Sequence, residues 1–176
     1  MFKALSSCLL LALSAGQAHA QDDGALRNTF YLGAGNARAD GPFENDDTPF
    51  SIGFMHQLAG SRMVLGFDLG AEGTMLDSTW GQDSQPEQGT SYNLLLGGNL
   101  LDSGRFRADA ALLAGVREAA ADCPDSYLGF QCYADSDPDT DYKGNFGGVL
   151  TVSVDRLTLG LRATGESTQM VAGFRF

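Results

Sequence analysis

The chain has 176 residues, with 22 acidic residues against 11 lysines and arginines, so its formal net charge is −11 at pH 7. Nucleic-acid binding requires clustered basic residues, and this acidic balance excludes nucleic acid as an expected partner. The length suits a single domain. Beyond residue 20, no apolar run approaches the ~20 residues of a helical membrane span, which excludes a helical membrane protein.

Residues 1–20 have the three parts of a secretory signal peptide. Lys3 supplies a positive start, Leu5–Ala15 form an apolar stretch too short to cross a bilayer, and Ala18-His19-Ala20 forms a small-x-small cleavage site. Cleavage removes one lysine and no acid, leaving 156 residues (176 − 20) with a net charge of −12 (−11 − 1). We therefore predict a cleaved signal over 1–20 and one exported domain over 21–176.

Eight stretches in the exported chain alternate apolar residues with small or polar ones, which is the period of a strand with one apolar face. They cover residues 30–34, 50–58, 63–71, 92–100, 106–116, 150–154, 157–163 and 168–176. Tight turns at 59–62, 102–105 and 155–156 alternate with long polar loops at 36–48, 76–90 and 118–145, and a short loop near Glu166. Short turns at one end and longer loops at the other are typical of up-and-down membrane barrels.

The opposite face of the same stretches carries four acids and four arginines, separated by glycines. These residues are Asp68, Glu72, Arg107, Asp109, Arg117, Arg162, Glu166 and Arg175. A soluble barrel would expose this face, whereas a membrane barrel would enclose it. Balanced charge favours enclosure, because an unpaired buried charge is costly. We therefore predict a polar core that blocks the lumen, in which Asp68, Glu72 and Asp109 pair with Arg107, Arg117, Arg162 and Arg175.

Aromatic residues of the apolar face fall at the ends of the stretches, as in the aromatic girdles of membrane barrels. Phe30, Phe106, Phe174 and Phe176 would lie at the turn end, and Phe50, Tyr92 and Phe146 at the loop end. Together these patterns predict an all-β fold: an eight-stranded antiparallel up-and-down transmembrane barrel with short periplasmic turns and longer extracellular loops. A secreted soluble ligand-binding barrel is the less favoured alternative.

The eight alternating stretches, the export signal and the VAGFRF ending at residues 171–176 resemble the small outer-membrane barrels of the OmpA and OmpX type. The resemblance implies a bacterial outer-membrane location, contact with outer-membrane lipid and lipopolysaccharide, and insertion by the outer-membrane assembly machinery, with Phe174 and Phe176 as its signal. It also implies a filled interior. We expect a structural or interaction role, with acidic loops facing an extracellular ligand or a host surface.

A channel for small solutes or hydrophobic compounds, as in OmpW-like barrels, is the alternative function. Leucine on the inward face would favour it, but we expect that face to be rich in Gly, Arg and Asp. The residue patterns of a hydrolytic site are missing from the exported chain. It has one histidine, His56, which falls on the apolar face. This histidine is not part of a His-x-Ser pair as in lipid A deacylase barrels, and no Gly-x-Ser-x-Gly elbow occurs. We therefore predict no enzymatic activity and no cofactor.

The longest predicted loop holds two further candidate features. Cys123 and Cys132 are the two cysteines of the exported chain and are expected to form a disulfide in an oxidising compartment. Asp135, Asp137, Asp139 and Asp141 alternate as carboxylate ligands for Ca²⁺ would, but the Gly and Glu of a helical calcium loop are missing. The sequence favours a solvated acidic loop over a metal site here.

Overall fold

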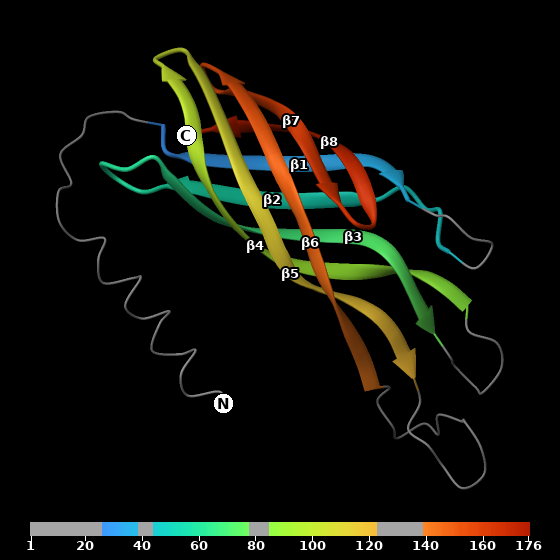
Figure 1. Cartoon of the computed structure of the whole chain (residues 1–176). Helices are drawn as coiled ribbons and strands as arrows, with labels where there is room; N and C mark the ends of the chain where they lie inside the picture. The colour runs from blue at the N-terminus through green and yellow to red at the C-terminus, as the bar shows by residue number, and fades with distance from the viewer. Residues whose placement is uncertain (1–25, 39–43, 78–84, 123–138) are drawn as a thin grey trace, which may run out of the picture.

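The computed structural model describes residues 26–38, 44–77, 85–122 and 139–176, and these residues form eight β-strands. The strands are β1 (Asn28–Ala37), β2 (Phe50–Gln57), β3 (Met63–Asp77), β4 (Gln85–Ser103), β5 (Phe106–Asp122), β6 (Asp139–Val154), β7 (Leu157–Thr164) and β8 (Ser167–Arg175). Each strand pairs antiparallel with the next and β8 pairs with β1, which closes the barrel (Figure 1). The predicted eight-stranded up-and-down fold is confirmed. No helix long and apolar enough to cross a membrane occurs in these four ranges.

The last strand closes the barrel against the first. Phe174 of β8 lies opposite Phe30 of β1, and Phe176 exchanges backbone hydrogen bonds with Asn28, at 2.9 Å for Asn28 N to Phe176 O and 3.0 Å for Phe176 N to Asn28 O. The Phe174 ring packs on those of Phe30 and Phe176, with centroids 5.6 and 5.5 Å apart. Closure pairs the first strand with the last, so in the part of the chain that the structure describes the barrel wall has no edge strand, which a bilayer would not tolerate.

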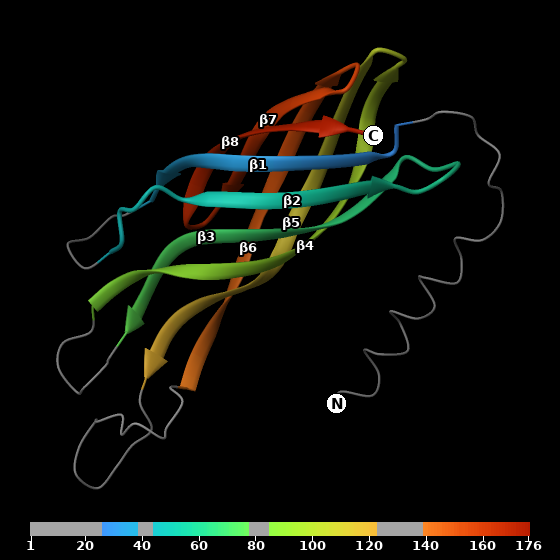
Figure 2. The same cartoon turned by 180° about the vertical axis from the view of Figure 1, so that it is seen from behind.

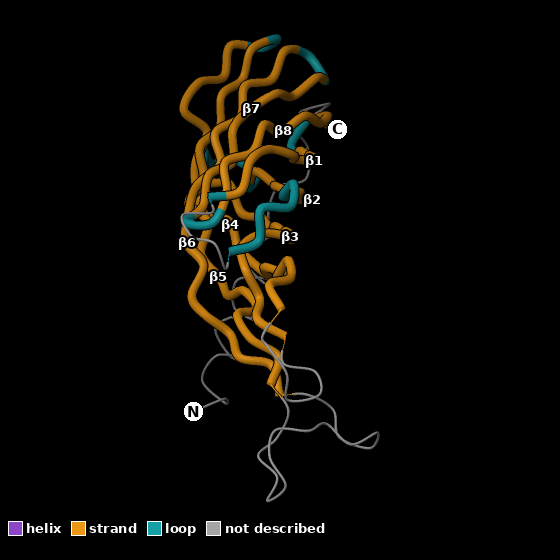
Figure 3. The backbone as a smooth tube through the Cα atoms, turned by 90° about the vertical axis from the view of Figure 1, so that its right-hand side faces the viewer, coloured by secondary structure: helices purple, strands orange, loops and turns teal. Residues whose placement is uncertain are grey.

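Four strands continue beyond the loop ends of the others, which the sequence pattern did not predict (Figures 2 and 3). β3 extends to Asp77, β4 starts at Gln85, β5 extends to Asp122 and β6 starts at Asp139, so the predicted loops at 76–90 and 118–145 were too long. In sequence, the extensions do not alternate apolar with polar residues, so they carry no period-two signal. Register shifts between Ala71 and Thr74 and between Glu118 and Ala120 mark where they begin.

The barrel wall is apolar outside and polar inside, and neighbouring leucines show the alternation. Leu94 is 69% exposed and Leu95 is 2% exposed on β4, while Leu112 is 73% exposed and Leu113 is 1% exposed on β5. Large exposed apolar side chains occur on all eight strands. The aromatics predicted for the girdles are exposed, except Phe30, which is half-buried. A continuous outward apolar surface of this kind requires lipid or another apolar environment.

Glycines on the inward face make room for the largest enclosed side chains. A Cβ at Gly53 would overlap the ring of Tyr31, whose hydroxyl donates a 2.7 Å hydrogen bond to Asp68. A Cβ at Gly70 would lie 3.1 Å from the Arg162 guanidinium and 2.7 Å from the Ser91 hydroxyl. The glycines of this face therefore allow a narrow barrel to hold bulky polar groups.

Gly53→Ala should lower the free energy of unfolding by about 1–3 kcal/mol, because the added methyl group forces Tyr31 to move. Urea titration of the refolded barrel in detergent, followed by far-ultraviolet circular dichroism, measures the change. Gly98→Ala is the matched control, since its Cβ would meet no described atom closer than the Arg62 carbonyl oxygen at 3.5 Å. Equal stability of the two variants would contradict the packing described here.

Candidate functional site

The centre of the barrel holds one arginine between two carboxylates. Arg162 extends from β7 across the lumen to β3, which lies on the opposite wall, and is completely buried together with Asp68 and Glu72. Its Nη2 lies 2.8 Å from Asp68 Oδ1 and 2.7 Å from Glu72 Oε1, and its Nη1 lies 2.8 Å from Glu72 Oε2. Its Nε donates to both Asp68 oxygens at 3.1 Å. One guanidinium thus binds both carboxylates in fork geometry.

Neutral side chains from five strands satisfy the remaining acceptor positions of these carboxylates. Asp68 accepts from the Tyr31 hydroxyl at 2.7 Å and from Asn93 Nδ2 at 3.1 Å. The donors to Glu72 are Ser91, Asn145, Thr164 and Ser167, at 2.5–3.0 Å. We call Arg162, Asp68, Glu72 and these six donors the central network. Such saturation is what makes a buried charge cluster tolerable in a low-dielectric interior.

An apolar layer lies between the central network and the turn end. Its members are Met55, Val64, Leu95, Ala111, Leu113, Val149 and Val171, all at most 5% exposed. Leu113 falls between Asp109 and Arg117 on β5, and Val171 falls between Ser167 and Arg175 on β8. The expectation of an inward face of Gly, Arg and Asp missed this layer. These residues alternate in register with the charged inward-facing residues, so the sequence pattern already indicated that they face inward.

The turn end of the lumen holds Arg107 and Arg175, and within the described ranges Arg107 alone has an acidic partner. Arg107 Nε lies 2.9 and 2.7 Å from the two Asp109 oxygens, and its Nη1 donates to Gln57 Oε1 at 2.5 Å. Arg175 donates through Nη2 to the Leu26 carbonyl oxygen at 3.0 Å, while its Nε and Nη1 are buried without a partner. Arg175 is enclosed as predicted, but its expected ion pair with an acid is not seen among the described residues.

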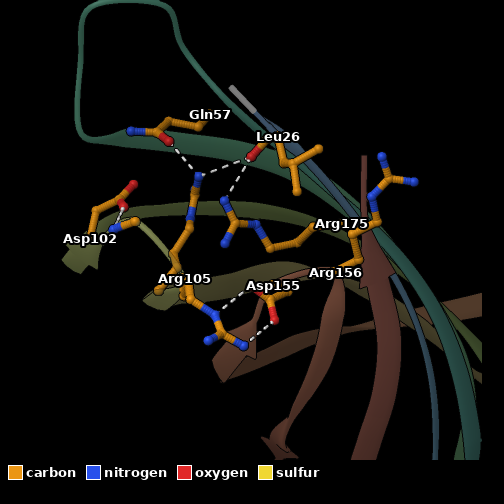
Figure 4. A pocket seen from close by; sticks show the side chains of 9 residues that line it. Leu26, Gln57, Asp102, Arg105, Asp155, Arg156 and Arg175 are labelled. Atoms are coloured by element: carbon orange, nitrogen blue, oxygen red, sulfur yellow. Dashed lines mark hydrogen bonds and ion pairs between the residues drawn. The ribbon is translucent and has the colours of Figure 1, made fainter. Parts of the chain in front are cut away.

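A cavity of about 500 Å³ opens beside Arg175 at this end (Figure 4). It is lined by Leu26, Gln57, Asp102, Gly104, Arg105, Arg107, Asp155, Arg156 and Arg175. In Figure 4 the Arg175 guanidinium lies within the cavity next to Leu26, whereas Arg156 points away from it. We call this space the turn-end cavity.

Two neighbouring turns at the same end are joined by an exposed ion pair. Arg105 Nε and Nη2 lie 3.0 and 2.9 Å from the Asp155 carboxylate oxygens. The hydrogen bonds from Arg105 lower the pKa of Asp155 below its ordinary value, and those to Asp155 raise the pKa of Arg105. Asp155 has a positive φ of 54°, a conformation that Asp tolerates in a two-residue turn.

The loop end of the lumen holds Arg117 and Glu166, which belong to the predicted charge set but were not predicted to pair with each other. Arg117 Nη2 lies 2.8 Å from Glu166 Oε1, and Arg117 Nη1 donates to the Thr74 and Glu118 carbonyl oxygens at 2.9 and 3.0 Å. A cavity of about 380 Å³ beside this pair is also lined by Arg38 and Lys143. Arg117 thus spans the loop-side mouth between three elements of the wall.

The other predicted site residues are placed as follows. His56 is exposed on the outward face at the turn end, with Nδ1 2.8 Å from Asn28 Oδ1, as its parity predicted. Residues 1–20, Cys123, Cys132, Asp135 and Asp137 lie outside the described residues. Asp139 begins β6, and Asp141 is exposed and paired with Ala120. Within the described ranges, no group of three or more His, Cys, Asp or Glu could hold a metal ion.

Arg162→Met should destabilise the folded barrel by about 3–5 kcal/mol, because it leaves two buried carboxylates without their cation. Adding Asp68→Asn and Glu72→Gln to this variant should restore part of the loss. Arg105→Met, which breaks the exposed pair at the turns, is the control and should leave the urea midpoint unchanged. An unchanged midpoint for Arg162→Met would contradict the central network.

No family model matches the sequence, and the search of curated proteins finds no match. Similar solved structures include two of the outer membrane protein Ail from Yersinia pestis, one in a phospholipid bilayer nanodisc and one in complex with the heparin analogue sucrose octasulfate. Each is 11% identical to this chain and covers 85% of it. The match spans 99% of the chain in the nanodisc structure, with a TM-score of 0.42, and 98% of the chain in the sucrose octasulfate complex, with a TM-score of 0.43. By its own strand pairing, closure and outward apolar face, the chain is in fold a closed eight-stranded antiparallel up-and-down β-barrel with an apolar exterior.

Proposed function

We propose that this protein is a bacterial outer-membrane barrel with a sealed interior, serving a structural and interaction role rather than transport. The observation that supports this proposal is that the wall is apolar outside and polar inside, the reverse of a soluble protein. Large apolar side chains are exposed on all eight strands, whereas Arg162 is completely buried. In a soluble barrel this arrangement would place apolar surface in water and charge in the core, and both are unfavourable. In lipid the same arrangement is the stable one.

The filled lumen supports a sealed barrel. Arg162 bridges opposite walls, the apolar layer lies on its turn side, and Arg117 spans the loop-side mouth. Transport would need a continuous path, and each of these three levels interrupts it. Eight strands enclose only enough space for side chains, which agrees with this interpretation. The alternative, a channel for small solutes or hydrophobic compounds, would require all three levels to move.

The extended β-hairpins support an interaction role on the loop side. β5 and β6 continue past the barrel and carry the segment 118–145, in which seven acids stand against one lysine. Charge of one sign attracts counterions and basic surfaces. We infer that this end presents an acidic surface to a cationic extracellular ligand or host surface, and to divalent cations that bridge it to lipopolysaccharide phosphates.

Assembly by the outer-membrane machinery is proposed to use the last strand. Phe174 is half exposed on the outward face, and Phe176 packs on Phe174 and Phe54 with centroids 5.5 and 6.4 Å apart. An aromatic end of this kind is available for recognition before β8 pairs with β1, and it packs into the turn-end girdle afterwards.

Leu112→Arg should cost about 2–4 kcal/mol in lipid vesicles, because it places a charge on the lipid face near the middle of the wall. Tyr142→Arg, on the extension of β6 beyond the Phe146 girdle, is the matched control and should cost little. Urea titration of both variants in vesicles measures the difference. Equal tolerance of the two substitutions would favour a soluble barrel and contradict the membrane assignment.

Planar-bilayer recordings should show no steady conductance for the wild-type barrel, because the lumen is interrupted at three levels. Shortening two residues of the apolar layer (Leu95→Ala with Leu113→Ala) should raise the frequency of brief openings. The outward neighbours (Leu94→Ala with Leu112→Ala) are the control and should stay silent. A large steady wild-type conductance would overturn the sealed interior and favour the channel alternative.

A further inference from the structure

We propose that the turn-end cavity is a binding site for one small oxyanion, a carboxylate or a phosphate group, held by Arg175. The proposal goes beyond the sealed barrel and does not depend on whether the lumen conducts. If the barrel lies in the outer membrane, this site faces the periplasm.

The hydrogen bonding of the Arg175 side chain indicates a bound ligand. It is 5% exposed, yet two of its three guanidinium nitrogens, Nε and Nη1, have no hydrogen-bond partner among the described residues. Burial without partners is costly for a charged donor, and the other enclosed arginines avoid that cost. Arg162 has two carboxylates, Arg107 has Asp109, and Arg117 has Glu166. An acceptor from outside the described residues would complete Arg175 in the same way.

Among the described residues that line the cavity, Arg175 is the enclosed arginine without a carboxylate partner. Four arginines line it (Arg105, Arg107, Arg156 and Arg175) against two aspartates (Asp102 and Asp155). Arg107 pairs with Asp109 and Arg105 pairs with Asp155, while Arg156 is exposed and points away from the cavity. One oxyanion would supply the charge partner that Arg175 lacks, because burying an uncompensated charge is unfavourable.

The shape of the site limits the ligand to a small group or the end of a larger molecule. The cavity holds about 500 Å³, and the side-chain carbonyl oxygen of Gln57, which also lines it, already accepts a hydrogen bond from Arg107 Nη1. Guanidinium groups bind carboxylate and phosphate oxygens through paired N–H donors. Chloride, which has no such paired oxygens, would use this geometry less well.

Two-dimensional NMR of the full exported chain, folded in an uncharged maltoside detergent, tests the proposal through the arginine Nε–H resonances. Sodium phosphate, sodium acetate and a short-chain phosphatidylglycerol are titrated separately, with sodium chloride at equal ionic strength as reference. Saturable shifts of the Arg175 resonance with phosphate or acetate are expected. A response to the lipid alone would assign the phosphate to a headgroup source and still support the site.

Variants separate a binding site from general electrostatics. Arg175→Gln should weaken binding at least about tenfold, as expected for loss of a charged hydrogen-bond donor, and Arg175→Lys should retain part of the affinity. Arg156→Gln, which also lines the cavity but points away from it, should leave the Kd nearly unchanged. Urea midpoints of all three variants show whether a lost response reflects lost folding, and Arg175→Lys keeps the test informative if Arg175→Gln fails to fold.

The proposal is overturned if no oxyanion shifts Arg175 beyond the chloride reference, which would assign its two nitrogens to water. It is also overturned if Arg156→Gln weakens binding as much as Arg175→Gln. Asp22 and Asp23 precede Leu26 in the sequence, so the titration is repeated with both changed to Asn. Binding seen only in that variant would mean that the chain supplies its own carboxylate, and would overturn an external ligand.

Discussion

The fold depends on a guanidinium held between two carboxylates inside a closed wall. Arg162 joins β7 to β3 across the lumen, and its partners collect hydrogen bonds from β1, β4, β6, β7 and β8. A barrel this narrow has no room for bulk water around a charge, so each enclosed charge must find its partner in the wall. Because the strands alternate, placing the polar and charged side chains inside leaves the apolar side chains on the outer surface.

Strand parity predicted which residues face inward but could not predict how they pair. Alternation alone placed Asp68, Glu72, Arg162 and Arg175 on the enclosed face. Pairing depends on strand tilt and stagger, which set the height of each residue in the lumen. Arg162 therefore reaches across to β3, whereas Arg107 binds Asp109 two residues along its own strand. For the same reason the sequence could not predict the partner of Arg175, whose position along the barrel axis places it beside the Leu26 carbonyl group.

Other features escaped the sequence reading for different physical reasons. The extensions of β3, β4, β5 and β6 show no alternation of apolar and polar residues in the sequence, so the period-two pattern could not reveal them. Tyr31 and Leu95 did share the inward parity and were recoverable from it. They were missed because only the charged residues of this face were considered. Tyr31 donates a hydrogen bond to Asp68, and Leu95 belongs to the apolar layer between the central network and the charged residues at the turn end.

Tryptophan quenching by brominated lipids tests the central claim, an apolar exterior in lipid around a charged interior, most directly. With the single native Trp80 changed to Phe, one tryptophan is introduced at Leu94, on the outer wall, or at Tyr142, on the extension of β6. We predict strong quenching of Leu94→Trp by bromines deep in the acyl chains and weak quenching of Tyr142→Trp at any depth. Equal, weak quenching of both in a folded barrel would contradict the account.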